Sequence, residues 1–181
     1  EQLSPDTHRA PDWYNASGYD YNDSIIYCFS HTRLSGTGAS DFIDIAFFPT
    51  TGNADSSRFS HLHEAASPGY YSVQLLDEDI RAELAATTRV GIHRYTYPAG
   101  KQRRLVIDLD HSANKGSWGR TIIQSQLRQT GLRTIEGFRV ITGWAKLRKV
   151  YFTAEFSEDI SDLCLSDGGI IRDGTTLING R

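Results

Sequence analysis

The segment from Tyr27 to Gly38 concentrates side chains that could bind or transform a ligand. Its sequence is Tyr-Cys-Phe-Ser-His-Thr-Arg-Leu-Ser-Gly-Thr-Gly. Hydroxyl, imidazole and guanidinium groups that suit a polyhydroxylated ligand come from Ser30, His31, Arg33, Ser35 and Thr37. Gly36 and Gly38 permit positive φ angles or a close approach of the backbone to another surface. We therefore expect a polar, glycine-flanked loop that presents hydrogen-bonding groups.

Aromatic residues precede this loop and could complete a sugar site. Sugars expose apolar C–H faces beside their hydroxyls, so their sites combine an aromatic platform with hydrogen-bonding side chains. The N-terminal part of the chain supplies Trp13, Tyr14, Tyr19 and Tyr21. Aromatic residues in β proteins also fill the core, so the residues alone leave both interpretations open.

Two other interpretations of the loop fail on spacing. A dinucleotide-binding fingerprint needs a third glycine where Asp41 stands, and it needs a helix to follow rather than a strand. A serine nucleophile could be assembled from Ser35, His31 and Asp41, but no strand-turn-helix elbow surrounds the serine. We therefore predict neither a nucleotide site nor any catalytic residue in this chain.

Metal ligands are sparse at recognisable spacings. Candidate histidines are His31, His61, His63, His93 and His111. His61-x-His63 is the only tight pair, and nothing completes a zinc set with it. Asp108 and Asp110 suggest calcium, but Ala113 stands where an EF-hand loop requires its glycine. We predict no metal site in this chain and interpret the two aspartates as the solvated end of a strand.

The elements that must position these residues are strands. Apolar runs at 25–29 and 42–48 flank the loop. Other segments rich in β-branched and aromatic residues and bounded by turn formers are 69–76, 87–97, 103–110, 134–144 and 147–156. Many short strands without a long helical period favour an all-β, antiparallel β-sandwich over a βαβ fold. Only 79–86 disputes this, because its residues have the propensity of a helix.

Composition limits the class of protein. The chain has 181 residues, 39% of them hydrophobic, which is enough for one good core and short for two domains. A formal charge of −3 with interspersed signs argues against a nucleic-acid partner. No apolar run is long enough to cross a bilayer, so we expect no membrane partner. Cys28 and Cys164 could be bridged or free, and their positions leave this open.

Several separate motifs, in order, resemble one family. They are Trp13 with Ser17-Gly18-Tyr19, the segment 27–45, Ala66-Ser67-Pro68-Gly69-Tyr70-Tyr71, Arg81-Ala82-Glu83-Leu84, His93-Arg94-Tyr95, Leu105-Val106-Ile107-Asp108-Leu109 and Val150-Tyr151-Phe152-Thr153-Ala154-Glu155-Phe156. The pattern resembles the N-terminal β-sandwich domain of glycoside hydrolase family 92, a family of exo-acting α-mannosidases that includes α-1,2-mannosidases. The resemblance covers most of the chain, and several motifs in the same order are hard to meet by chance.

The resemblance implies a supersandwich of the galactose mutarotase-like kind over residues 1–181, a single domain that could be incomplete at both ends. It also implies that 79–86 is a strand rather than a helix. In such enzymes the sandwich packs on a larger helical domain, which supplies the acid, the base and the Ca²⁺ site. The resemblance therefore implies no cofactor in this chain, and Ca²⁺ in a catalytic domain that the chain lacks. The implied partners are an α-mannoside or other glycan and that helical domain, in a secreted or periplasmic parent whose signal peptide is not in this chain.

The resemblance also implies a set of substrate-binding residues. They are Trp13, Ser30, His31, Arg33, Ser35, Gly36, Thr37 and Gly38, with Trp13 as the aromatic contact. The usual form of the loop is Gly-Phe-Ser-His-Thr-His-Leu-Ser-Gly-Thr-Gly, so Cys28 replaces a glycine and Arg33 replaces a histidine. Arginine is longer, permanently charged and donor-only, so this departure leaves linkage preference and the activity of the parent open.

Three functional hypotheses follow. The first is the non-catalytic N-terminal domain of a calcium-dependent, inverting exo-α-mannosidase, which contributes part of the substrate pocket and is inactive alone. The alternative is a free-standing, lectin-like carbohydrate-binding module with Trp13 and the loop as a complete site. The third is a structural shell on which a catalytic domain docks.

Overall fold

The computed structural model describes residues 2–9, 15–33, 41–113, 121–167, 170–173 and 176–180. The regular elements among these residues are strands and one short 3₁₀ helix, η1 (His61–His63). All their pairings are antiparallel, which agrees with the predicted all-β class. The chain divides into two compact units, residues 1–115 (unit 1) and residues 116–181 (unit 2).

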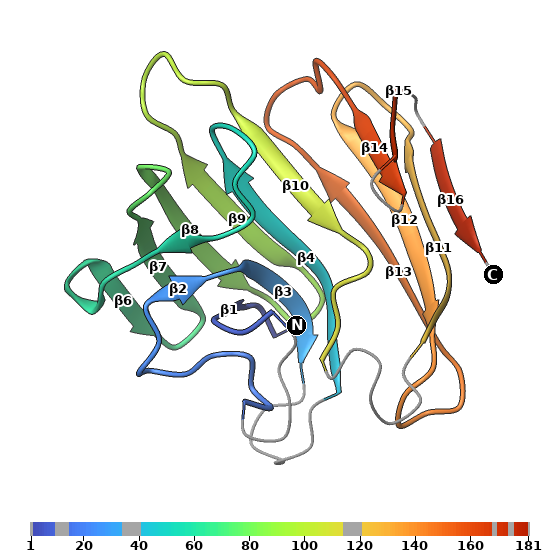
Figure 1. Cartoon of the computed structure of the whole chain (residues 1–181), viewed down its shortest axis with the longest axis horizontal. Coiled ribbons are helices and arrows are strands. Elements are labelled where there is room, and N and C mark those ends of the chain that lie inside the picture. Colours follow the sequence, from blue (N-terminus) through green and yellow to red (C-terminus); the bar gives the residue numbers. More distant parts are fainter. Residues whose placement is uncertain are drawn as a thin grey trace. The chain divides into compact units, whose positions relative to one another are not determined.

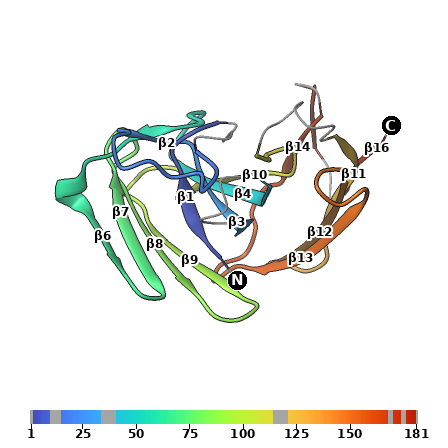
Figure 2. The same ribbon diagram turned by 90° about the horizontal axis from the view of Figure 1, so that it is seen from below.

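Unit 1 contains two four-stranded sheets. The first has the order β1-β3-β4-β10, formed by β1 (Ser4–Asp6), β3 (Cys28–Arg33), β4 (Phe42–Thr50) and β10 (Arg104–Asp108). The second has the order β6-β7-β8-β9, formed by β6 (Glu64–Ser67), β7 (Tyr70–Leu75), β8 (Ile80–Ala86) and β9 (Gly91–Thr96). A small ribbon pairs β2 (Ile25–Ile26) with β5 (Ser57–Arg58). Figures 1 and 2 show the second sheet as a layer of its own beside the first.

The hydrophobic core of unit 1 joins these two sheets. Its buried members are Ile26, Phe29, Phe48, Phe59, Val73, Leu75, Ile80, Ala82 and Leu84. Phe29 and Phe48 come from the first sheet, while most of the others come from β7 and β8 in the second. Burying each large side chain of this kind contributes about 1.5–3 kcal/mol. The contact of one sheet face with another is the packing of a β-sandwich.

Residues 79–86 form β8 rather than a helix, as the family resemblance implies. Ile80, Ala82 and Leu84 are buried in strict alternation, while Arg81 is exposed and Glu83 half-buried. A helix would place these three apolar side chains around more than half a turn, whereas a strand places all of them on one face. Their burial in the core outweighs the helical propensity of the segment.

Unit 2 contains a four-stranded sheet and a separate hairpin. The sheet has the order β13-β12-β11-β16, formed by β11 (Ile122–Gln129), β12 (Thr134–Ile141), β13 (Arg148–Glu155) and β16 (Thr176–Gly180). The hairpin pairs β14 (Cys164–Asp167) with β15 (Ile170–Asp173). The strands predicted within 134–144 and 147–156 correspond to β12 and β13. Strand β11 was not predicted, because its alternation includes polar residues on both faces, such as buried Ser125 and exposed Gln124.

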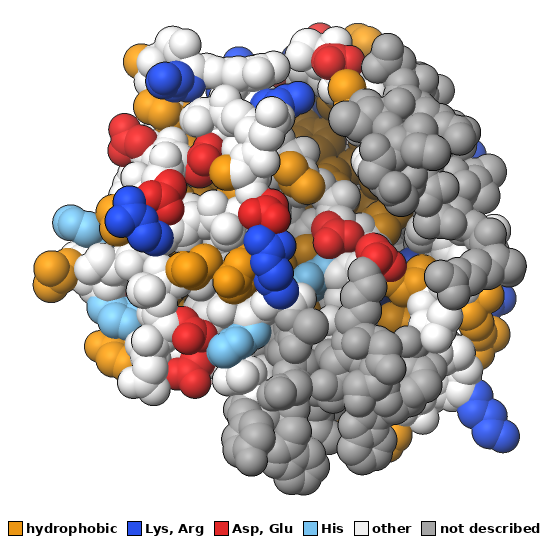
Figure 3. All heavy atoms as spheres, viewed as in Figure 1, with side chains coloured by type: hydrophobic (Ala, Val, Ile, Leu, Met, Phe, Trp, Pro, Cys, Tyr) orange, Lys and Arg blue, Asp and Glu red, His pale blue; other side chains and the backbone are white. Residues whose placement is uncertain are grey.

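The two cysteines are free thiols. Cys28 is buried in unit 1, and Cys164 is exposed in unit 2. Among the described residues, no helix is long and apolar enough to cross a membrane. On the face seen in Figure 3, acidic and basic side chains of the described surface lie among uncharged ones without a large patch of one sign.

Candidate functional site

Strand β3 carries the three predicted site residues that the structure describes. Ser30, His31 and Arg33 lie at its C-terminal half. The other predicted site residues lie outside the described residues; they are Trp13, Ser35, Gly36, Thr37 and Gly38. Substrate binding by this set therefore stays a prediction.

The pairing of β3 with β4 is irregular at this point. Ser30 pairs with Ala46 but His31 pairs with Asp44, so Ile45 is an extra residue that bulges out of the ladder. Ile45 has φ of 48°, and Ile43 has φ of 56°. Such angles are costly for β-branched residues and are held only where the surrounding packing imposes them. Bulges redirect side chains at sheet edges and near binding sites.

His31 belongs to a cluster of rings on the first and second sheets. Its Nε2 lies 2.9 Å from His93 Nε2 on β9, and the Nδ1 of His93 lies 2.7 Å from the Tyr95 hydroxyl. Phe47 on β4 contacts both imidazoles, with ring centroids 5.5 Å from His31 and 5.0 Å from His93. Gly91 makes room for this arrangement, because a Cβ at that position would clash with the His31 ring. His31 is half-buried, so it is held firmly while keeping some accessible surface.

Ser30 and Arg33 are buried and bind within unit 1. The Arg33 guanidinium donates to Asp6 on β1 and to the Ser17 carbonyl oxygen. It also donates to the Ser4 carbonyl oxygen at 3.1 Å and to the Ser30 hydroxyl at 2.6 Å. Its side chain is 4% exposed and that of Asp6 is 0% exposed. Ser30 and Arg33 therefore tie β3 to β1.

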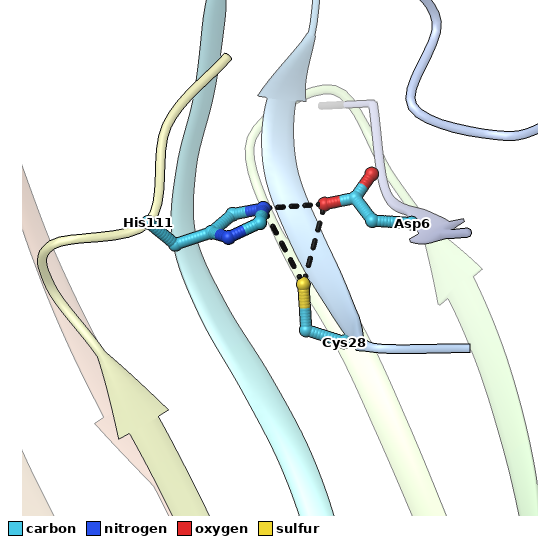
Figure 4. Close-up of side chains that lie close together, drawn as sticks. All are labelled: Asp6, Cys28 and His111. Carbon is cyan, nitrogen blue, oxygen red and sulfur yellow. Dashed lines mark hydrogen bonds and ion pairs between the residues drawn. The ribbon is translucent and has the colours of Figure 1, made fainter. Parts of the chain in front are cut away.

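Asp6 is the centre of a buried polar cluster that also contains Cys28 and His111. Figure 4 shows the three side chains converging from β1, from the start of β3 and from the segment after β10. His111 Nε2 lies 2.8 Å from Asp6 Oδ2, and the Cys28 thiol lies 3.3 Å from the same oxygen. Cys28 Sγ is 3.4 Å from His111 Nε2. Sequence spacing gave no signal for this cluster, since its members are far apart along the chain.

The electrostatics of the cluster favour a charged Asp6 and a neutral Cys28. Burial alone would raise the pKa of Asp6, but the Arg33 charge and the His111 hydrogen bond lower that pKa to about 2. Burial, followed by the negative charge of Asp6, raises the pKa of the Cys28 thiol well above its usual range. A nucleophilic cysteine needs a lowered pKa and some exposure. In a thiol catalytic triad the carboxylate also binds the imidazole nitrogen opposite the thiol, whereas here both groups face Nε2. The cluster therefore does not suit thiol catalysis.

The two departures from the usual family motif meet at this carboxylate. Arg33 binds Asp6 Oδ1, while Cys28 donates to Asp6 Oδ2. From the sequence, replacement of histidine by the longer Arg33 is expected to alter the shape of a pocket. In the structure, Arg33 and Cys28 both bind the buried carboxylate of Asp6.

The predicted aromatic Tyr19 lies beside a second carboxylate, Glu64, together with Tyr71. The hydroxyls of Tyr19 and Tyr71 donate to Glu64 at 3.1 and 2.6 Å, and His61 Nδ1 lies 2.5 Å from it. Burial, followed by interaction with Glu64, raises the pKa of both tyrosines. Tyr21 is exposed and stacks on His61 with ring centroids 4.0 Å apart. One face of the Tyr21 ring is thus already covered by an imidazole.

A polar cavity of about 370 Å³ lies at the N-terminal part of unit 1. It is lined by Thr7, His8, Arg9, Asn22, Asp23, Ser24, Ile25 and Tyr27. His8 Nε2 lies 2.8 Å from Asp23 Oδ2, and the Arg9 guanidinium lies 4.6 Å from the centre of the Tyr27 ring. Arg9 thus covers one face of the Tyr27 ring.

Asp108 and Asp110 lie at the end of β10, as the sequence predicts. Asp108 is its last residue, and its carboxylate accepts a hydrogen bond of 2.7 Å from the Asp110 backbone N–H. Both residues are exposed. The pair therefore closes a turn at the strand end.

Comparison with known proteins identifies the family. The profile described as "Glycosyl hydrolase family 92 N-terminal domain" matches residues 1–181. The family 92 α-mannosidase BT3965 from Bacteroides thetaiotaomicron, solved in complex with mannoimidazole, is 34% identical with a TM-score of 0.89. That match covers 98% of this chain and 25% of BT3965, and a second structure of BT3965 gives 34% identity, coverage of 98% and 26%, and a TM-score of 0.90.

A further family 92 glycosyl hydrolase, ccman5, is 30% identical with a TM-score of 0.79, over 97% of this chain and 25% of its own. No curated protein gives a significant sequence match. The chain spans about a quarter of the solved chains that it matches. The profile match over residues 1–181 and the identity to BT3965 show that this chain belongs to glycosyl hydrolase family 92, as an N-terminal domain of that family.

Proposed function

We propose that the chain is the non-catalytic N-terminal portion of a calcium-dependent, inverting exo-α-mannosidase and forms part of its glycan pocket. One observation carries the proposal: the chain matches a quarter of BT3965, an α-mannosidase solved with mannoimidazole, at 34% identity. The remaining three-quarters of such a protein offers room for a catalytic domain. We further propose a secreted or periplasmic parent, because glycan substrates of exo-acting enzymes are found mainly outside the cytoplasm.

The distribution of ligands supports a calcium site outside this chain. Ca²⁺ takes about six to eight oxygen ligands. The tight cluster among the described residues, Asp6 with Cys28 and His111, offers one carboxylate beside a thiol and an imidazole. Inversion further requires a general acid and a general base about 6.5–9.5 Å apart, and the sequence identifies no such pair in this chain.

In this proposal, the chain contributes polar side chains to the pocket and holds the strand that carries them in place. His31 offers a half-buried imidazole whose orientation is set by His93, Phe47 and the space at Gly91. Ser30 and Arg33 hold β3 against β1. They thereby fix the position of the strand that carries His31. Direct sugar contacts are assigned to Trp13, His31 and the segment 35–38. The bulge and left-handed backbone at Ile43 and Ile45 support a binding role for this end of the sheet.

Turnover by the chain alone tests the assignment of catalysis to another domain. The purified chain is incubated with an aryl α-mannoside and with α-mannobiose in the presence of Ca²⁺. We expect no turnover above the uncatalysed rate, because the acid, the base and the metal ligands are supplied elsewhere. Robust turnover, retained after repurification, would refute the proposal.

Calorimetric titration with mannose and mannobiose distinguishes the proposal from a lectin-like module. An incomplete pocket gives no measurable heat of binding to the isolated chain. A module with a complete site gives saturable binding, which would favour the alternative. His31→Ala serves as the matched variant, because any genuine binding at the predicted site should weaken when this imidazole is removed.

A further inference from the structure

We propose that Asp6, Cys28 and His111 form a binding site for a zinc ion, with Asp6 Oδ2, Cys28 Sγ and His111 Nε2 as ligands. Each residue offers one ligand atom, and the three atoms all lie within 4.8 Å of one another. All three residues are buried in unit 1. Thiolate, imidazole and carboxylate are the ligand types that zinc uses in proteins.

The spacing of the three atoms is close to that of a tetrahedral zinc site. Zinc bonds of about 2.0–2.3 Å at tetrahedral angles place ligand atoms about 3.3–3.6 Å apart. The observed separations are 2.8 Å for His111 with Asp6, 3.3 Å for Cys28 with Asp6 and 3.4 Å for Cys28 with His111. The two pairs that include the sulfur thus need to open by only a few tenths of an ångström, and the His111–Asp6 pair by about half an ångström. Side-chain torsions can supply such a change without moving the strands.

The surroundings of Asp6 match those of a carboxylate that binds a metal. Ligating carboxylates are themselves held by hydrogen bonds through their second oxygen. Arg33 binds Asp6 Oδ1 and is in turn held by the Ser30 hydroxyl at 2.6 Å and the Ser4 carbonyl oxygen at 3.1 Å. Oδ2 is the oxygen that faces Cys28 and His111. Asp6 Oδ1 is therefore held by Arg33, while Oδ2 faces the proposed metal position.

Without a metal, Asp6 Oδ2 holds the cluster together by accepting hydrogen bonds from His111 Nε2 and from the Cys28 thiol. The Cys28 sulfur and His111 Nε2 are then neighbours at 3.4 Å because they share this acceptor. A metal ion at the centre of the triangle would bind all three atoms at once.

Binding releases the Cys28 thiol proton, because zinc is bound by the thiolate. When His111 carries its proton on Nε2, that proton moves to Nδ1 or to water, since the ligating nitrogen must be neutral and unprotonated. Zn²⁺ with one thiolate and one carboxylate is electrically neutral, and Arg33 leaves the group with one positive charge. The carboxylate of Asp108, which already acts on Cys28, lies close enough to reduce that charge. Three protein ligands leave one tetrahedral position for water.

Metal content and a cobalt spectrum test the site directly. The chain is produced as Cys164→Ser, so that Cys28 is its sole thiol, and it is refolded with Zn²⁺ or Co²⁺ and then dialysed. We expect one metal ion per chain and, with Co²⁺, a thiolate-to-cobalt charge-transfer band with tetrahedral ligand-field absorption. Cys28→Ser in the same background should lose that band and most of the bound metal. His63→Ala, which changes an exposed histidine, should leave both unchanged.

A second measurement applies even where Cys28→Ser does not fold. Zinc that binds the folded state raises the unfolding midpoint of the Cys164→Ser chain as its free concentration rises. It also slows alkylation of Cys28 in moderate denaturant. A folded Cys164→Ser chain that retains no metal, or a cobalt complex without the thiolate band, would show that the cluster is a hydrogen-bonded core group and would overturn the proposal. The proposed function would be untouched by that result.

Discussion

Arg33 illustrates how one residue can belong to a predicted binding motif and also to the interior. Its side chain is almost fully buried, and it pairs with an Asp6 that has no exposed surface. A buried ion pair loses hydration on folding and regains stability only through close partners. Arg33 has four of them, of which the Ser30 hydroxyl at 2.6 Å comes from its own strand. At the residue scale, the consequence is that removing either charge leaves the other buried without its charged partner.

We predict that Arg33→Met destabilises unit 1 by about 3–5 kcal/mol, because the buried Asp6 carboxylate then loses the Arg33 charge and keeps only its bonds to His111 and Cys28. Urea unfolding monitored by tryptophan fluorescence and circular dichroism measures the change. Arg94→Met is the matched control, since Arg94 is exposed and its nearest carboxylate contact, Glu83, is 3.6 Å away. Equal stability of the two variants would contradict the structural role assigned to Arg33.

Glu78 gives a pH-dependent contribution to stability. Burial alone would raise its pKa, but hydrogen bonds from the Thr51 N–H and from the Thr50 and Thr51 hydroxyls lower it below the usual 4.5. A pKa that is lower in the folded state stabilises the fold above pH 4.5, and this contribution is lost as pH falls through the folded pKa. We predict that Glu78→Gln costs about 1 kcal/mol at neutral pH and that its cost shrinks in acid.

Chemical unfolding of the wild type and of Glu78→Gln across the acid range measures this difference. Glu155→Gln provides the control, because Glu155 is exposed at the end of β13. A difference between wild type and Glu78→Gln that stays constant down to strongly acidic pH would rule out the linkage.

Which secondary structure a segment of this chain adopts depends on the burial of its side chains as much as on its intrinsic propensity. Strand β8 forms from a helix-favouring segment because three alternating apolar residues enter the core. In β12, Gly137 faces Phe152 of β13 across the pair, and it lies against the backbone of β11 on its other side. A Cβ at Gly137 would lie 2.5 Å from Phe152 Cε1 and 2.7 Å from the Gln126 carbonyl oxygen. The packing of two neighbouring strands therefore requires glycine at this position.

We predict that Gly137→Ala destabilises unit 2 by about 1–3 kcal/mol through overpacking. Adding Phe152→Leu should recover part of the loss, because the Phe152 ring supplies two of the three closest contacts and the Gln126 oxygen remains. Gly52→Ala is the control, since nothing lies within 4 Å of a Cβ at that position. Thermal unfolding of the single and double variants measures the coupling, and a Gly137→Ala chain as stable as Gly52→Ala would contradict the packing argument.

At the scale of the whole molecule, the chain accounts for about a quarter of the proteins it matches. It forms two compact units, residues 1–115 and residues 116–181. Its stability therefore resides in its own sheets, while the chemistry that we propose requires the rest of the parent. Effects on stability and effects on activity should accordingly separate at half-buried His31, but not at buried Arg33.

In the parent enzyme, we predict that His31→Ala lowers kcat/KM for an α-mannoside by roughly ten- to hundredfold, because one polar contact to substrate is lost. The unfolding midpoint of the parent should change little, since His31 is only half-buried. His63→Ala, at an exposed position of η1, controls for the loss of a histidine. Steady-state kinetics and thermal unfolding of the three proteins provide the comparison. Unchanged kcat/KM in His31→Ala would remove His31 from the pocket.

The sequence by itself determined the all-β class, about half of the strands and the family, because alternation, turn residues and ordered motifs are properties of short stretches of chain. It also marked β3 as the strand that carries the distinctive motif. Only the tertiary structure brought Asp6 and His111 to Cys28, and Asp6 to Arg33, and only it resolved 79–86 as a strand on grounds of packing. The reason is physical. Contacts between residues far apart in sequence depend on which sheet faces pack against each other, and a short sequence pattern does not specify that packing.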